Sequence, residues 1–141
     1  YQLPAPKVEG HPYDFSFSGL KTAVVNLVHN AEQRGEPLDK AALAADFAET
    51  VAQVLSSRLV AAAEELGYRK LVCSGGVSAN SQLRARLQEK AAGLGATLYL
   101  PPISLCGDNA AMIGSQAYYE YLAGNVAGME LNARATLDIS Q

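Results

Sequence analysis

Two short apolar runs, separated by one helical stretch, constrain the fold of this chain most. The first run, residues 70–74, ends at Gly75-Gly76, and the second, residues 96–100, ends at Pro101-Pro102. Residues 80–92 between them are predicted to form a helix whose apolar side chains share one face: Leu83, Leu87 and Ala91. A helical crossover joins parallel strands through a right-handed connection. The sequence therefore predicts an α/β fold with two neighbouring parallel strands, the first of them buried, and covering helices.

Three further helices are expected around this strand–helix–strand unit. They lie at about residues 20–33, 40–66 and 108–123, and Asp39 is the predicted cap of the second. The second helix carries an apolar stripe that steps by three and four: Leu43, Phe47, Val51, Val54, Leu55, Leu59, Ala62 and Leu66. Two strands make a poor sheet, so we expect further strands from outside this sequence.

The composition fits a globular protein. Of the 141 residues 49% are hydrophobic and 18% charged, which is typical of one folded domain, 1–141. The two cysteines form no metal or disulfide pattern, and no apolar run reaches membrane-spanning length, so we expect a reduced, cytoplasmic protein without membrane contact. The net charge of −3 indicates no general affinity for nucleic acid. The chain opens at Tyr1 in a proline-rich stretch, and we interpret it as a piece of a longer protein.

The loop after the first predicted strand is the strongest candidate for a ligand site. Gly75 and Gly76 permit positive φ and close backbone approach, and a helix begins shortly afterwards. This arrangement suits a nucleotide at the carboxyl end of a parallel sheet, and Asn80 is able to hydrogen-bond to it. The alternative is a tight turn in which Asn80 only caps the helix. Neither a Rossmann nor a P-loop motif is present.

The loop after the second predicted strand supplies a carboxylate. Asp108 lies in the stretch from Cys106 to Ile113, which follows that strand and therefore opens on the same edge of the sheet. A carboxylate there is a candidate ligand for a metal ion that faces phosphates. The alternative is that Asp108 is the helix N-cap.

Three ordered motifs resemble the TsaD family, the tRNA N6-adenosine threonylcarbamoyltransferases once described as O-sialoglycoprotein endopeptidases. They are Phe15–Ala23, Ser74–Asn80 and Cys106–Ile113, and Leu3–Pro6 upstream is also similar. The resemblance covers about residues 3–124. It implies the actin-like ATPase (ASKHA) fold, of which this chain would be a C-terminal, nucleotide-binding lobe fragment with the N-terminal half missing.

The resemblance also implies the site and the reaction. Gly75 and Gly76 match the adenosine-binding turn, Asn80 a nucleotide- or substrate-contacting asparagine, and Asp108 a metal ligand. The implied metal is Fe²⁺, or alternatively Zn²⁺, but the family's two histidine ligands, four residues apart on one helix, are absent from this chain. The implied reaction is t6A formation: threonylcarbamoyl-AMP donates its threonylcarbamoyl group to N6 of the adenosine beside the tRNA anticodon, and the implied small-molecule ligand is threonylcarbamoyl-AMP or ATP. The implied partners are tRNA, TsaB and TsaE-like proteins, and the fragment alone is expected to be inactive.

Two other classes of function stay open. The chain is alternatively a non-catalytic assembly module of the same complex, or part of another actin-like enzyme such as a carbamoyltransferase or kinase. A peptidase is the least favoured, because no H-E-x-x-H motif or activated nucleophile is evident.

The remaining reactive side chains are interpreted structurally. His29 is assigned to a helix surface, Cys73 to the core, and Cys106 has no nearby histidine to activate it. His11 lies in a loop and has no identified partner. Lys21 is a candidate for the active-site crevice without an assigned role. Three residues are predicted to form a helix packing face: Tyr118, Tyr119 and Tyr121. Three others are predicted to form a solvated helix face, with tRNA contact as the alternative: Arg84, Arg86 and Lys90.

Overall fold

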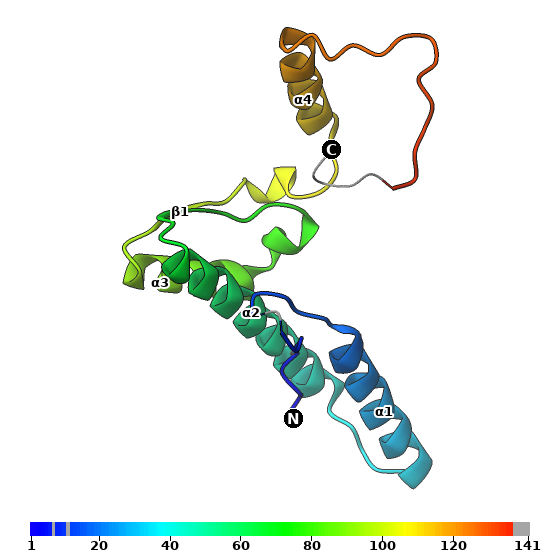
Figure 1. Ribbon diagram of the computed structural model, residues 1–141. Helices are drawn as coiled ribbons and strands as arrows, with labels where there is room; N and C mark the ends of the chain where they lie inside the picture. Colours follow the sequence, from blue (N-terminus) through cyan, green and yellow to red (C-terminus); the bar gives the residue numbers. More distant parts are fainter. Residues whose placement is uncertain (7, 11, 137–141) are drawn as a thin grey trace. The chain divides into compact units, whose positions relative to one another are not determined.

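The computed structural model describes residues 1–6, 8–10 and 12–136. Four α-helices and two strands occur among them: α1 (Ser18–Arg34), α2 (Lys40–Glu65), β1 (Lys70–Val72), α3 (Ser81–Gly93), β2 (Thr97–Tyr99) and α4 (Ala110–Leu122). Two short 3₁₀ turns, Gly76–Ala79 and Ile103–Leu105, follow the strands. The chain divides into two units, Tyr1–Gly107 and Asp108–Gln141, each of which is described by itself (Figure 1).

The predicted strand pair is confirmed. Strands β1 and β2 pair in parallel, with Leu71 opposite Leu98, and α3 is the crossover between them. The flanking backbone extends the ladder, since the Cys73 amide donates to the Tyr99 carbonyl oxygen at 3.1 Å.

The sheet is covered on one face only. Leu71 is 4% exposed, whereas its neighbour Val72 is 67% exposed and Tyr99 is 50% exposed. Successive side chains of a strand point to opposite faces, so one face packs on helices and the other is bare within this unit. The expectation of a fully buried first strand is therefore wrong for this chain.

The core lies where α2 and α3 pack on the covered face. The predicted α3 face is confirmed, because Leu83, Leu87 and Ala91 are all at most 3% exposed. They pack with partly buried side chains of α2, of β2 and of the residues that follow β1 and α3: Leu55, Leu59, Leu98, Cys73 and Leu94.

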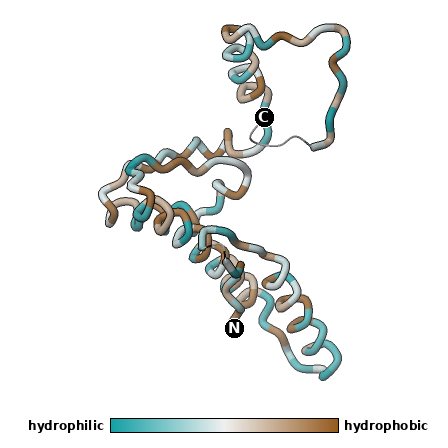
Figure 2. Tube along the Cα trace, in the orientation of Figure 1, coloured by the Kyte–Doolittle hydropathy of each residue, from teal (hydrophilic) through white to brown (hydrophobic). Residues whose placement is uncertain are grey.

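The apolar stripe predicted for α2 is only partly buried. Leu43 and Val54 are buried, but Phe47 is 37% exposed and Leu66 is 59% exposed. Small side chains occupy the contact surface in their place: Ala52, Ser56 and Ala63. Small residues let helix backbones approach closely, which the pattern of large apolar residues does not indicate. Figure 2 shows hydrophobic positions recurring along α2 between hydrophilic ones.

The cap predicted for α2 is confirmed. The Ala42 amide donates to Asp39 Oδ1 at 3.0 Å, so Asp39 is the N-cap of α2. None of the described helices has the length and apolarity needed to cross a bilayer.

Candidate functional site

The loop after β1 contains one glycine that needs its special backbone freedom. Gly75 has φ 86° and ψ 172°, a conformation that is essentially restricted to glycine. Gly76 has an ordinary φ and opens the 3₁₀ turn Gly76–Ala79. The prediction of a positive φ at the glycine pair is therefore confirmed for Gly75 alone.

Asn80 closes this loop as the N-cap of α3. Its Oδ1 accepts a hydrogen bond from the Leu83 amide at 2.9 Å, and the residue is exposed. The capping interpretation is thus confirmed. The cap uses the side-chain oxygen and leaves the amide nitrogen as a donor at the surface, so nucleotide contact by Asn80 stays a prediction.

The loop after β2 meets the first loop at Cys106. Ser78 Oγ lies 3.2 Å from Cys106 Sγ and 2.7 Å from the Gly75 carbonyl oxygen. Ser78 is 1% exposed and Cys106 is 4% exposed. The two loops lie on one edge of the sheet, as parallel strands require, and their contact is buried.

Arg84 is the residue that the sequence analysis missed. It was assigned to a solvated helix face, but its guanidinium is bound inside the unit. Nε donates to the Ser78 carbonyl oxygen at 2.5 Å, and Nη2 donates to the Pro101 carbonyl oxygen at 2.6 Å and to Cys106 Sγ at 3.1 Å. One side chain of α3 therefore holds both loops. No residue pattern distinguishes this arginine from its neighbours.

Arg86 is also hydrogen-bonded, but at the surface. Its guanidinium forms an ion pair with Glu49, and Nη1 donates to Gln53 Oε1 at 2.6 Å, so it joins α3 to α2. The solvated-face interpretation is therefore wrong for Arg84, whereas Arg86 forms its ion pair at the solvent-exposed surface.

Asp108 begins the second unit and is exposed. The N-cap of α4 is the next residue, Asn109, whose Oδ1 accepts from the Met112 amide at 3.0 Å. The capping alternative for Asp108 is therefore wrong, which leaves its carboxylate available for another role. The meeting of Asp108 with Asn80 stays a prediction, because the two residues belong to different units.

The donor set of the described residues does not fit a metal ion by itself. No cluster of three or more histidine, cysteine, aspartate or glutamate side chains occurs in that part of the chain. His29 is exposed on α1, and His11 lies outside the described residues. Asp108 is at most one ligand of a site completed from elsewhere.

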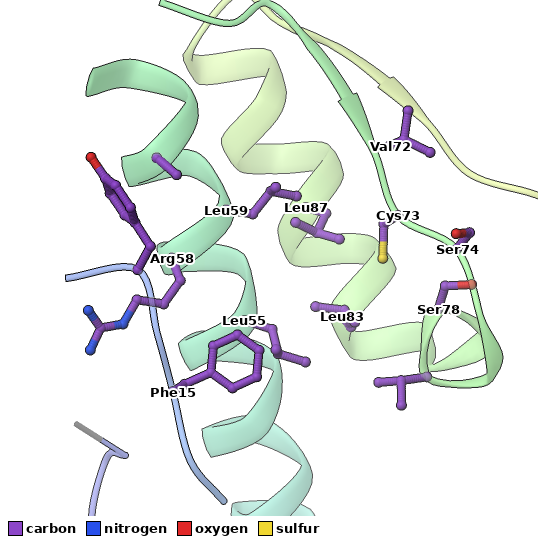
Figure 3. A pocket seen from close by; sticks show the side chains of 13 residues that line it. Phe15, Leu55, Arg58, Leu59, Val72, Cys73, Ser74, Ser78, Leu83 and Leu87 are labelled. Carbon is purple, nitrogen blue, oxygen red and sulfur yellow. The ribbon is translucent and has the colours of Figure 1, made fainter. Parts of the chain in front are cut away.

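A groove of about 540 Å³ opens beside the first loop (Figure 3). Leu55 and Leu59 of α2 face Leu83 and Leu87 of α3 across it, and Ser74 and Ser78 lie at its loop end. The lining is mainly apolar and includes Arg58, so most of the groove suits a weakly polar group.

Cys73 lines the same groove but is not suited to nucleophilic attack. Burial raises the pKa of the Cys73 thiol above its ordinary value, against a smaller lowering by Arg84. A raised pKa leaves less thiolate at neutral pH, and the side chain packs against Leu83 and Leu87. This supports the core interpretation.

Two further candidates lie away from the loops. Lys21 lines a separate groove of about 420 Å³ between α1 and α2. Three tyrosines of α4 are 59–71% exposed, so the packing face predicted for them has no buried contact in the described chain: Tyr118, Tyr119 and Tyr121.

Comparison with known proteins supplies the family context. Residues 1–115 match the family model TsaD, described as tRNA N6-adenosine threonylcarbamoyltransferase. A curated relative of that name from Lactobacillus delbrueckii subsp. bulgaricus is 44% identical over 141 residues, covering 99% of this chain and 41% of its own length. Those from Shouchella clausii and Bacillus cereus are 47% and 49% identical over 138 residues, covering 98% and 97% of this chain and 41% and 40% of their own lengths. The chain spans about two fifths of the curated relatives it matches.

Proposed function

This chain belongs to the TsaD family, and we propose that it forms part of an enzyme that attaches a threonylcarbamoyl group to N6 of the adenosine beside the tRNA anticodon. The match over residues 1–115 carries this proposal. The family implies an actin-like ASKHA fold, and the α/β architecture with a parallel strand pair agrees with it. We further propose that residues 1–141 are one C-terminal nucleotide-binding lobe of that fold.

The donor in the proposed reaction is threonylcarbamoyl-AMP. N6 of the adenosine attacks the carbamoyl carbon, the bond from that carbon to the phosphate oxygen breaks, and AMP leaves with the bonding electrons while N6 loses a proton. AMP is a good leaving group, so the protein's task is to position the donor and stabilise charge on its oxygens.

The first loop is the proposed nucleotide contact of this chain. Gly75 and Gly76 bring backbone close to the adenosine, and the Asn80 amide nitrogen donates to a ribose or phosphate oxygen. The exposed position of all three residues supports this, because no side chain of the described unit covers them.

Asp108 is the proposed contribution of this chain to a divalent metal site. Because the described residues do not complete such a site, we propose that its other ligands come from residues outside that part of the chain. Fe²⁺ is the proposed ion, with Zn²⁺ as the alternative. The proposed partners are tRNA, TsaB and TsaE-like proteins, and a reaction on tRNA supports the cytoplasmic location expected from the sequence.

A non-catalytic assembly module is the second candidate. The bare sheet face at Val72 and Tyr99 and the exposed tyrosines of α4 favour it, because apolar surface of this kind is commonly covered by other protein.

The experiment uses the full-length protein that contains this sequence. It is incubated with unmodified tRNA, threonylcarbamoyl-AMP and the proposed partner proteins, and t6A is measured by mass spectrometry of the digested tRNA. Formation of t6A supports the enzyme. If the complex assembles and forms t6A equally well when Asp108 and Asn80 are both replaced by alanine, the assembly module is the correct function.

The same assay on the 141-residue chain checks completeness. We expect weak iron or zinc binding and no t6A from this chain alone, since no group of metal ligands is found among the described residues. Metal analysis and nucleoside mass spectrometry measure the two quantities, and turnover by the short chain would show that the chemistry is placed wrongly.

A further inference from the structure

We propose that Arg84 is a positioning residue that couples the two loops of the site, so that the donor bound by one loop is aligned with the groups carried by the other. This inference rests on the proposed function and adds a residue to it. The hydrogen bonds of Arg84 go to Ser78, Pro101 and Cys106 and to none of the proposed contact residues. Arg84 acts through the loops that carry them.

The hydrogen bonds of Arg84 connect two segments that are remote in sequence. Its acceptors are the Ser78 carbonyl in the first loop and the Pro101 carbonyl and Cys106 thiol in the second, which lie 17 and 22 residues from Arg84. The guanidinium is a rigid planar fork, so bonds from Nε and Nη2 fix the direction as well as the spacing of these groups.

The bonded groups lie next to the candidate site residues. Ser78 precedes Asn80 by two residues, and Cys106 precedes Asp108 by two residues. A shift of the first loop therefore moves Asn80, and the second loop is the segment that leads into Asp108. Ser78 and Cys106 are also in direct contact with each other, so Arg84 binds the two loops where they meet in a buried contact.

Arg84 is not needed to form either loop separately. The first loop has its own bonds, from the Ser78 amide and hydroxyl to the Gly75 carbonyl and from the Leu83 amide to Asn80. The second loop has the bond from the Leu105 amide to the Pro102 carbonyl at 2.9 Å. Removing the guanidinium should therefore leave two formed loops whose spacing is no longer fixed.

Because Arg84 fixes the spacing of the loops and not their separate structures, its loss should affect kcat more than KM. Donor binding relies mainly on the first loop, whereas transfer needs both loops in register. A misplacement of about 1 Å at a reacting centre costs on the order of 100-fold in rate. In the full-length enzyme we expect Arg84→Met to lower kcat by about 100-fold with a much smaller change in the KM for threonylcarbamoyl-AMP.

Arg86→Met is the matched control. Arg86 is on the same helix, and the same substitution there removes bonds to Glu49 and Gln53 of α2 without touching either loop. Arg84→Lys is the second variant: it keeps the charge but not the fork, and should restore part of the kcat. If Arg84→Met and Arg86→Met lower kcat equally, or if Arg84→Met changes only the melting temperature, Arg84 is a scaffold residue and the proposal fails.

A thiol readout separates this proposal from the proposed function. The Cys106 thiol is bound by Ser78 and Arg84 and nearly inaccessible, so Arg84→Met should accelerate its alkylation by iodoacetamide relative to Cys73, whereas Arg86→Met should not. Mass spectrometry of the alkylated full-length protein measures both cysteines. If the full-length protein forms no t6A but Cys106 is alkylated faster in Arg84→Met than in Arg86→Met, the proposed function is wrong and the coupling by Arg84 is supported. Equal alkylation in the two variants disproves the coupling whatever the activity.

Discussion

The starts of α3 and α4 use the same cap and differ in where they put the candidate ligand. In each, an asparagine Oδ1 accepts from the amide three residues on, at 2.9 Å for Asn80 and 3.0 Å for Asn109. At α3 the capping residue is itself the candidate ligand, and its amide nitrogen is the donor that the cap does not use. At α4 the cap is Asn109, and the preceding Asp108 has its carboxylate free of capping. At α3 one residue is therefore both the cap and the candidate ligand, whereas at α4 these are two different residues.

The largest expected effect is a loss of activity on substitution of Asp108, just before α4. In the full-length enzyme Asp108→Ala should abolish t6A formation, because it removes the proposed metal ligand, yet leave the helix start intact. Asn109→Ala should instead cost about 1 kcal/mol of stability, the usual value of a lost cap. Activity and thermal unfolding of both variants measure the separation. If Asp108→Ala keeps the full metal content and rate, the site assignment is wrong.

At α3 the two roles require two substitutions to separate. Asn80→Ala should weaken nucleotide binding by about 1.5–3 kcal/mol, the range for a hydrogen bond to a charged group. It should also cost about 1 kcal/mol of stability through the cap. Asn80→Asp keeps the capping oxygen and removes the amide donor.

We therefore expect Asn80→Asp to lose nucleotide affinity at nearly unchanged stability. Calorimetric titration with ATP and thermal unfolding give the two quantities. Wild-type affinity in Asn80→Asp would mean that Asn80 is only a cap.

The smallest expected effect is a difference in stability between glycine variants of the loops that precede α3 and α4. Gly75 has a φ of 86°, whereas Gly76 and Gly107 have ordinary φ values and open space where a Cβ would stand. Gly75→Ala should cost about 1–3 kcal/mol of stability. Gly76→Ala and Gly107→Ala should be nearly neutral in unfolding experiments.

Gly76→Ala then gives an independent test of the nucleotide contact. If the backbone approaches the adenosine at this residue, the added methyl group should weaken ATP binding although stability is unchanged. Unchanged affinity would restrict the proposed contact to Gly75 and Asn80.

Local pattern was sufficient for much of the fold. The parallel strands, the α3 core face and the Asp39 cap are confirmed because each depends on a short run of residues with a strong preference. The bare sheet face was missed because Val72 is as apolar as a buried residue, and only the surroundings decide which face is covered. The contact surface of α2 was missed because alanine and serine carry little weight in a hydrophobic pattern.

The site was predicted in part for the same reason. The two loops on one sheet edge follow from topology, and Gly75 and Asn80 have strong local signatures. Arg84 has none, because its acceptors are carbonyls and a thiol that any sequence supplies and that only the tertiary structure brings to α3. The sequence did not distinguish Asp108 from Asn109 as the cap of α4, because both residue types cap equally well. The observed cap is Asn109, since the helix begins one residue later than a cap at Asp108 would require.

The conformation of Gly75 has a consequence for handedness. Its φ and ψ are close to the mirror image of an extended L-residue, and no atom lies within 4 Å of the position that a Cβ would take. Only chirality, and not space, excludes a side chain there. A D-alanine introduced at this residue by chemical ligation would keep the native φ and ψ without torsional strain. It should stabilise the folded chain relative to the unfolded one, since the unfolded chain loses the freedom that glycine gives it.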